Sequence, residues 1–376
     1  STSINAAIAS VLFRGRRRGM ARQRCGVACG YLAPMGKVIV TGGAGYIGSH
    51  SAVELAAAGH VPVLVDDLRN SEAAVLDGLA KLIGRRPVLH RVDCTDRHAL
   101  DAVFRAEGPV DGVVHFAADK AVGESVQDPL KYYANNVGSL VALLQVMRDH
   151  AVRTLVFSSS CTVYGQPDRL PVGEDAPDHN ALSPYGATKV MGERILRDLV
   201  ASDPGWRVVL LRYFNPIGAH PSAGIGELPL GVPNNLVPFA TQVAAGLRDR
   251  LVIHGTDYPT PDGSCVRDYI HVVDLAQAHV KALAWAEART EATCEVFNLG
   301  TGRGSRVLEG VRGLEAVTGR PLPHLLGPRR AGDVPEVFGD PRTAGAVLGW
   351  KASRTLHDAL ADAWRWQQTL ADRDRG

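Results

Sequence analysis

The feature that most constrains this chain is a short apolar strand that runs directly into a glycine-rich turn. Residues 37–41 read Lys-Val-Ile-Val-Thr, an apolar run typical of a buried parallel strand. The next residues, 42–48, have the spacing G-x-x-G-x-x-G, and an Ala/Leu-rich segment at 46–58 predicts a helix. Glycines at such a turn let the backbone approach a pyrophosphate, and the helix N-terminus supplies N–H groups to the anion. The pattern therefore predicts a dinucleotide-binding unit of a parallel α/β fold.

The rest of the first half repeats this alternation. Further strands are expected at 61–65, 87–92, 113–116, 154–158 and 208–213, and helices at 71–83, 96–106, 128–149 and 183–201. Regular alternation predicts a Rossmann-type, doubly wound parallel sheet of the α/β class. After about residue 215, Gly/Pro-rich loops separate shorter elements. We therefore expect a dinucleotide-binding Rossmann domain at 37–214 and a smaller, mainly substrate-binding domain at 215–376, from which some segments return to the Rossmann sheet.

Composition excludes several other classes of protein. Of the 376 residues, 45% are hydrophobic and 21% are charged, which is ordinary for a packed globular protein and excludes a disordered chain. No apolar run approaches the roughly 18 residues of a membrane-spanning helix. Six cysteines in so long a chain do not form a disulfide framework. As free thiols they fit a reducing compartment, so we expect a cytoplasmic protein that does not associate with membranes.

Charge is distributed unevenly along the chain. The formal net charge is +2, but residues 1–36 hold six arginines and no acid, which leaves the remaining body at −4. A mildly acidic body does not suggest a nucleic-acid partner, because a nucleic-acid surface needs clustered Lys and Arg.

Residues 1–36 are a separate arm. Their Ala-, Ser- and Arg-rich composition is typical of an organelle transit peptide. We favour the interpretation that Met35, just before the first strand, is the natural start and that the preceding residues are upstream sequence. Cys25 and Cys29 have no second Cys or His pair nearby, so we expect no metal site there. The arm is expected to be disordered and without chemistry.

An acid at the end of the second strand strengthens the dinucleotide interpretation. Asp66 lies 24 residues after Gly42, where a carboxylate accepts hydrogen bonds from an adenosine ribose and repels a 2′-phosphate. The sequence therefore favours NAD over NADP, although Arg69 nearby favours the opposite. The alternative is that Asp66 is an ordinary turn acid. Asp93, after the third strand, is a candidate for contact with the adenine edge, with the same alternative.

Tyr185 and Lys189 are four residues apart in a predicted helix and therefore share one face. The phenol has an ordinary pKa of about 10, and bringing it to about 7 takes roughly 4 kcal/mol. A neighbouring ammonium and a cationic nicotinamide both favour the phenolate. Ser160 ends the preceding strand and is placed to pass a proton between Tyr185 and a substrate hydroxyl. Such a pair is commonly only a surface feature, but the glycine turn and the serine-rich strand end favour a catalytic one. Cys161 has no evident His partner and is interpreted as a packing thiol.

From about residue 37 to 370, the chain resembles the UDP-glucose (UDP-galactose) 4-epimerases, extended members of the short-chain dehydrogenase/reductase superfamily. The matching stretches include Val40-Thr-Gly-Gly-Ala-Gly-Tyr-Ile-Gly-Ser-His50, Lys120-Ala-Val-Gly-Glu-Ser-Val-Gln127, Ser183-Pro-Tyr-Gly186, Leu211-Arg-Tyr-Phe-Asn-Pro216, Pro233-Asn-Asn-Leu236 and Val266-Arg-Asp-Tyr-Ile-His271. The resemblance implies interconversion of UDP-glucose and UDP-galactose at C4 through a transient 4-keto sugar, with NAD tightly bound. It also implies a homodimer, for which helices 96–106 and 128–149 are candidate interface elements.

The resemblance implies a role for each matching residue. Tyr185 would remove the proton of the 4-hydroxyl, Lys189 would hold the nicotinamide ribose, and Ser160 and Thr162 would bind the reacting oxygen. The implied cofactor contacts are Gly42, Gly45, Tyr46, Ile47, Gly48, Asp66, Asp67, Asn70, Ser71, Asp93, Cys94, Phe116, Ala117, Ala118, Lys120, Asn135, Ser158, Tyr185, Lys189 and Tyr213. The implied substrate contacts are Lys120, Ser160, Tyr185, Asn215, Asn235, Leu236, Val252, His254, Arg267, Arg330, Asp333 and Val337. Arg267 and Arg330 suit a diphosphate, which rewards charge-assisted donors. No metal site is implied.

Three positions bear on how far the resemblance extends. His254 stands where the family often has an aromatic residue near the uracil, and Arg306 replaces a usual small polar residue, for which the sequence offers no reason. Val337 stands where side-chain size limits the substituent at C2 of the sugar. Because valine is small, we expect UDP-N-acetyl sugars to be accepted as well.

Of three other activities, two fit the residues poorly. A nucleotide-sugar 4,6-dehydratase needs an Asp-Glu pair just after Thr162, but this chain has Val163-Tyr164. A dehydrogenase with net turnover would exchange its cofactor freely. A non-enzymatic NAD-sensing regulator would lose the Tyr/Lys pair, which is present here.

Overall fold

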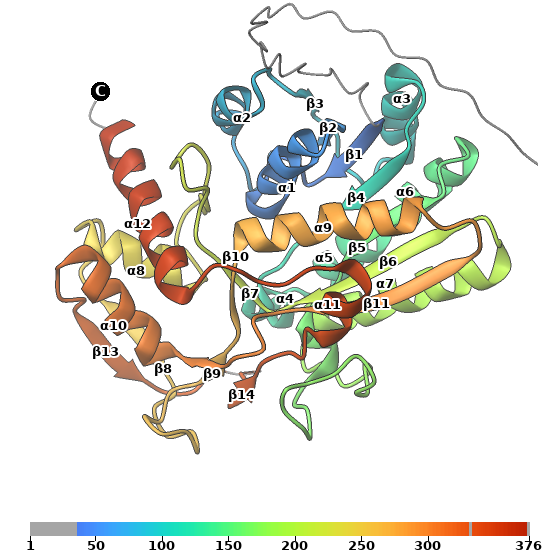
Figure 1. Ribbon diagram of the computed structural model, residues 1–376. Coiled ribbons are helices and arrows are strands. Elements are labelled where there is room, and N and C mark those ends of the chain that lie inside the picture. The colour runs from blue at the N-terminus through green and yellow to red at the C-terminus, as the bar shows by residue number, and fades with distance from the viewer. Residues whose placement is uncertain (1–35, 331–332, 374–376) are drawn as a thin grey trace, which may run out of the picture. The chain divides into compact units, whose positions relative to one another are not determined.

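The computed structural model describes residues 36–330 and 333–373, so the predictions for the arm, with Cys25, Cys29 and Met35, lie outside the described residues. A seven-stranded sheet forms the centre, with strand order β11-β6-β5-β4-β1-β2-β3 (Figure 1). Its strands are β1 (Lys37–Thr41), β2 (Val61–Val65), β3 (Val88–His90), β4 (Gly112–His115), β5 (Thr154–Ser158), β6 (Arg207–Tyr213) and β11 (Thr293–Leu299). Each neighbouring pair is parallel, which confirms the predicted Rossmann-type α/β fold.

Helices cover both faces of this sheet, because its strands are apolar on both sides. On one face the core is built by α1 (Tyr46–Ala57), α2 (Val75–Ile83), α9 (Val272–Glu287) and α11 (Arg342–Leu348). On the other it is built by α3 (Arg97–Glu107), α6 (Gly138–Asp149) and α7 (Pro184–Ser202). Val38, Ile39 and Val40 are fully buried. At about 1.5–3 kcal/mol for each such side chain, the central strands supply much of the hydrophobic stabilisation.

Apart from α9, β11 and α11, the residues after β6 form smaller elements beside the carboxyl ends of the strands. Two-stranded sheets join β7 (Asn215–Ile217) to β10 (Tyr269–His271) and β8 (Leu251–His254) to β13 (His324–Gly327), and a third sheet holds β12 (Ser305–Arg306), β9 (Val266–Arg267) and β14 (Glu336–Val337). The helices here are α8 (Leu236–Ala244), α10 (Val307–Thr318) and α12 (Leu356–Arg373), whose apolar residues share a separate core cluster. The domain boundary at residue 215 remains a prediction.

Two expected helices differ from the structure. The helix expected at 71–83 begins only at Val75, because the residues before it form tight turns, in which Val75 and Leu76 donate their N–H groups to the carbonyls of Glu72 and Ala73.

The single helix expected at 128–149 is divided into α5 (Pro129–Tyr132), a π-helical turn (Tyr133–Val137) and α6, and it is preceded by α4 (Val122–Gln127). Within the π turn, the Asn136 amide donates to the Asp119 carbonyl and to the Thr188 hydroxyl. These contacts with distant residues explain the interruption.

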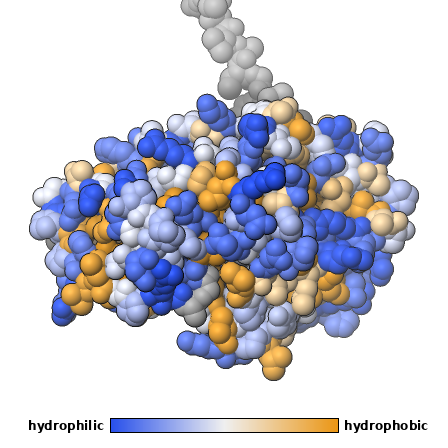
Figure 2. Space-filling view, turned by 90° about the horizontal axis from the view of Figure 1, so that it is seen from below, coloured by the Kyte–Doolittle hydropathy of each residue, from blue (hydrophilic) through white to orange (hydrophobic). Residues whose placement is uncertain are grey.

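No helix of residues 36–330 and 333–373 is long and apolar enough to cross a bilayer. On the face shown in Figure 2, hydrophilic residues predominate and hydrophobic residues lie in separate groups.

Candidate active site

The glycine turn between β1 and α1 is packed too closely for side chains. Gly42 has a φ of +67°, and a Cβ there would lie 2.9 Å from the backbone nitrogen of Ala117. A Cβ on Gly48 would lie 2.2 Å from the Gly42 carbonyl oxygen. Helix α1 begins at Tyr46 with Gly45 as its N-cap and no side chain bound there, so its N-terminal N–H groups face an open turn. Such a turn can accept a pyrophosphate, and the assignment of its residues to the cofactor stays a prediction.

Asp66 is buried at the end of β2 beside this turn. Its carboxylate accepts hydrogen bonds from the Ala44 N–H, the Leu68 N–H and the Ser71 hydroxyl. A carboxylate has about four acceptor positions, so one remains for a ribose hydroxyl.

Arg69 does not act as a free phosphate ligand. Its guanidinium is bound to the Asp67 carboxylate, to Asp93 at 2.8 Å and to the Asn135 amide oxygen at 3.1 Å. Two carboxylates already neutralise this cation, which removes the one feature of the sequence that favoured NADP.

The predicted catalytic residues meet at the carboxyl edge of the sheet. Ser183 caps α7 and Pro184 is its first residue, so Tyr185 lies in the first turn with its side chain half-buried. The Tyr185 hydroxyl is hydrogen-bonded to the side chain of Ser160. Lys189 is 4% exposed, donates to the Ser158 carbonyl at 2.7 Å and lies 5.8 Å from the centre of the Tyr185 ring. The geometry therefore joins a phenol, a hydroxyl and an ammonium in one cluster.

The protein's own groups do not lower the pKa of Tyr185. Burial raises it to about 12, and the hydrogen bond from Ser160 opposes this rise only in part. Burial also lowers the pKa of Lys189 to about 8, while the Glu193 carboxylate raises it. In the protein without cofactor, desolvation of the phenolate is the larger effect, so the lowering of the Tyr185 pKa by the ammonium and a cationic nicotinamide stays a prediction.

The hydroxyl of Thr162 has no hydrogen-bond partner among the described residues, although the atom is buried. A buried hydroxyl without a partner costs about 1–3 kcal/mol, so such an atom commonly marks a ligand position. Thr162 stands two residues after Ser160 and donates its backbone N–H to the Ser160 hydroxyl. Both side chains are thus available to an oxygen held near Tyr185.

The remaining predicted cofactor residues lie around the same strand ends. Phe116 packs against the ring of His279, with 4.7 Å between centroids, and Tyr213 shares a hydrogen bond with Ser158. Cys94 is buried, and burial raises the pKa of its thiol, so it is not a nucleophile. Tyr46 donates to the Gly218 carbonyl at 2.7 Å. Ile47 is the second residue of α1, and Asn70, Ala117 and Ala118 lie in the segments after β2 and β4.

A cavity of about 470 Å³ brings together most of the predicted substrate residues. Those that line it are Asn215, Asn235, Leu236, Val252, His254, Arg267, Arg330 and Asp333. Arg267 and Arg330 both reach the Asp333 carboxylate, at 3.5 and 3.1 Å. Two arginines that share one carboxylate retain a net positive charge, which suits a diphosphate.

Four predicted substrate residues do not line this cavity: Lys120, Ser160, Tyr185 and Val337. Val337 is 6% exposed and packs with Val163, Tyr164 and Phe214. Lys120 instead pairs with Glu227 at 3.4 Å, and the same carboxylate accepts from the Asn235 amide at 2.7 Å. Glu227 was not predicted, because no local pattern distinguishes it from a surface acid.

Arg306, which the sequence left unexplained, stands at the N-cap of α10. Its guanidinium lies 3.7 Å from Asp262 and 3.8 Å from Glu309, so it joins a loop to the first turn of the helix. His254 lines the cavity, and its Nδ1 lies 3.3 Å from the Pro328 carbonyl.

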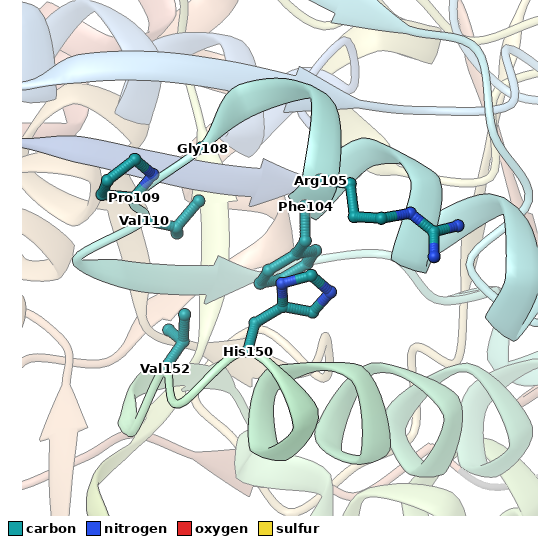
Figure 3. A pocket seen from close by; sticks show the side chains of 7 residues that line it. All are labelled: Phe104, Arg105, Gly108, Pro109, Val110, His150 and Val152. Carbon is teal, nitrogen blue, oxygen red and sulfur yellow. The ribbon is translucent and has the colours of Figure 1, made fainter.

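A second cavity, of about 400 Å³, lies at the opposite edge of the sheet. Figure 3 shows the rings of Phe104 and His150 on one side of it, and Pro109 and Val110 on the other. These residues precede β4 or end α3 and α6, so the cavity is far from the catalytic cluster in the topology. None of the predicted site residues lines it.

A buried ion pair behind the catalytic helix was not predicted from the sequence. Glu193 and Arg212 are each 1% exposed and are joined by two hydrogen bonds, at 2.8 and 2.6 Å. The only sequence signal was spacing, because Glu193 follows Lys189 by one helical turn.

Comparisons with known proteins agree with this geometry. The model of the NAD dependent epimerase/dehydratase family matches residues 38–300. The chain belongs to this family. A UDP-glucose 4-epimerase of Bacillus subtilis is 51% identical over 332 residues, which cover 88% of this chain and 97% of the relative.

Solved epimerases have the same fold. The UDP-glucose 4-epimerase of Stenotrophomonas maltophila, solved with NAD and formylated UDP-arabinopyranose, is 47% identical, with a TM-score of 0.86 over 90% of this chain and 99% of that one. That of Bifidobacterium longum, solved with NAD+ and UDP, is 44% identical, with a TM-score of 0.86 over 89% and 99%. The predicted resemblance is therefore confirmed.

NAD is the cofactor of this epimerase family, and the residues present fit it. The glycine turn admits a pyrophosphate, Asp66 keeps an acceptor position beside it, and the buried hydroxyl of Thr162, two residues after Ser160, has no partner among the described residues.

Proposed function

We propose that this protein interconverts UDP-glucose and UDP-galactose by inverting carbon 4 of the sugar through a transient 4-keto sugar. The observation that carries the proposal is the position of the Tyr185 hydroxyl. It is bonded to Ser160, one helical turn from Lys189, at the sheet edge that also carries the glycine turn. Relatives that are about half identical over nearly their whole length have this activity in their names.

In this proposal the chain's own residues bind the substrate and move one proton. Arg267 and Arg330 hold the diphosphate, so the sugar is directed away from them toward α7. Tyr185 Oη takes the proton of the 4-hydroxyl and returns it after the sugar has turned over, and Ser160 and Thr162 hold the reacting oxygen. Bound NAD supplies a hydride acceptor and donor, so the net redox change is zero.

The residues after Thr162 support epimerisation over dehydration. Val163 is fully buried, and the Tyr164 hydroxyl donates to Asn298 at 2.7 Å and accepts from Arg212 at 3.0 Å. Elimination of water needs an acid–base pair at these two positions, and neither side chain supplies one.

The test is conversion of UDP-galactose by the purified protein with no added NAD. Formation of UDP-glucose, followed by chromatography, is the expected result, because a cofactor that is regenerated in each turnover need not leave. A reaction that requires added NAD in proportion to product would instead indicate a dehydrogenase. No conversion of any UDP-hexose, with NAD retained by the protein, would contradict the proposal.

We further propose that UDP-N-acetylglucosamine is accepted, because Val337 is small. Val337→Tyr is expected to lower kcat/KM for UDP-N-acetylglucosamine about 10-fold or more while UDP-glucose is still converted, since a bulky phenol would fill the space for the N-acetyl group. Steady-state rates with both substrates measure this. Equal rates for the wild type and the variant with the N-acetyl sugar would refute the specificity role.

We also propose a cytoplasmic homodimer. Val126, Leu130 and Met191 are exposed apolar side chains on α4, α5 and α7, which pack against one another. A second copy that covers this face would remove them from water. Sedimentation is expected to give twice the mass of one chain, and Leu130→Glu is expected to give a monomer. A monomeric wild type at micromolar concentration would contradict this.

A further inference from the structure

Tyr185, Lys189 and Glu193 are spaced four residues apart along α7 and therefore share one face of the helix. The first two belong to the catalytic cluster. Glu193 lies one turn deeper, is 1% exposed, and reaches both the strand that carries the catalytic serines and the ammonium of Lys189.

The first contact ties the helix to the end of β5. The Ser159 hydroxyl is buried and donates to the Glu193 carboxylate at 2.5 Å. Ser159 stands between Ser158, whose carbonyl accepts from Lys189, and Ser160, whose hydroxyl is bonded to Tyr185. A hydrogen bond at the middle residue therefore fixes its two neighbours relative to the helix.

The second contact is electrostatic. Lys189 lies near Tyr185 and Glu193 on α7, 5.1 Å from the centre of the Phe157 ring on β5, and near the neutral ring of His115 on β4. Burial lowers the pKa of Lys189 to about 8. Among the groups around it, the Glu193 carboxylate is the one that favours its charged form.

Glu193 itself is held rigidly. Arg212 donates to both carboxylate oxygens, and Arg197 donates to Glu193 at 2.8 Å and to Asp178 at 3.0 Å. Asp178 also accepts from Arg212 at 2.6 Å. Two arginines and two acids thus form a closed network, which pairs the buried carboxylate with opposite charge and fixes its position.

We propose that Glu193 is a positioning residue for the catalytic cluster, which aligns Ser158 and Ser160 through Ser159 and keeps Lys189 protonated. The proposal rests on the epimerase activity and adds to it a residue that does not touch substrate or cofactor.

The test is the pH dependence of kcat for UDP-galactose in Glu193→Gln. Without the carboxylate, the ammonium of Lys189 loses its favourable neighbour, so its pKa falls and the alkaline limb of the profile moves to lower pH, by about one unit. Glu193→Asp keeps the charge and is expected to restore most of the limb. Asp198→Asn is the matched control, because it removes an exposed ion pair with Arg194 from the same helix and should leave the profile unchanged.

Ser159→Ala tests the alignment separately. It removes the tie to β5 without a change of charge, so kcat is expected to fall about 10-fold with the alkaline limb in place. Ser139→Ala, which removes a buried hydroxyl from α6, is its control.

An alkaline limb that does not move in Glu193→Gln, or a normal kcat in Ser159→Ala, would overturn the proposal. If Glu193→Gln does not fold, Ser159→Ala decides alone. A wild type without epimerase activity would instead refute the proposed function.

Discussion

Tyr185→Phe is expected to lower the turnover of UDP-galactose by about 10² or more, because general acid–base groups contribute about 10²–10⁴ to the rate. The variant keeps the ring on α7 and loses only the hydroxyl that is bonded to Ser160. The glycine turn and Asp66 are untouched, so NAD should remain bound. Turnover is measured by chromatography of the sugar nucleotides, and bound NAD by its release on denaturation.

Tyr132→Phe is the matched control. It deletes a buried hydroxyl that donates to Glu124 at 2.7 Å, on a helix that carries no predicted catalytic group. Its turnover should remain close to that of the wild type. Near-normal turnover in Tyr185→Phe would remove this residue from its proposed role.

Acidification is expected to destabilise the fold steeply between pH 6.5 and about 5. Five of the described histidines are at most 2% exposed, and the pKa is lowered furthest in four of them: His50, His115, His271 and His279. Burial lowers the pKa to about 3 for His50 and His115, and to about 4 for His271 and His279.

Stability falls with pH because the unfolded chain binds more protons than the folded protein. In this range the folded protein keeps these rings neutral, while the unfolded chain protonates them at a pKa of about 6.5. Each ring therefore removes about 1.4 kcal/mol of stability per pH unit as the pH falls, and the four together about 5 kcal/mol. Carboxyls whose pKa is raised by burial, such as Asp268, act in the opposite direction nearer pH 4.

Urea unfolding at several pH values measures this slope. His279→Phe removes one of the four rings and should reduce the slope by about one quarter. His98→Gln is the control, because His98 is exposed on α3. Stability that is independent of pH between 7 and 5 would show that the four rings titrate normally in the fold.

Local pattern was enough to predict most of the central sheet. Strands 61–65 and 154–158 agree with β2 and β5, because an apolar run between turn residues has few other ways to bury both faces. The π turn at Tyr133–Val137 was not predictable in this way. Asn136 makes it by binding Thr188, which is 52 residues away in sequence. Contacts of that kind depend on the assembled fold.

The candidate site also combines residues that local spacing predicts with residues that only the assembled fold brings together. The glycine turn, Asp66 and the Tyr185–Lys189 pair were inferred from spacing, and the structure places them at one edge of the sheet. The cavity residues such as Arg267 and Arg330 were inferred only from resemblance, since single cations have no local signature. Glu193 was missed because two of its partners, Ser159 and Arg212, come from other segments that only the tertiary structure brings beside α7.

The seventh strand, β11, has a consequence for biosynthesis. It pairs with β6, yet about 80 residues of smaller elements separate the two in sequence. During synthesis, one edge of β6 therefore has no pairing strand until Leu299, the last residue of β11, has left the ribosome. Val208 to Leu211 are completely buried in the folded protein. A nascent chain that pauses before Leu299 has been synthesised therefore exposes an apolar strand edge, which is the kind of surface that aggregates or binds chaperones.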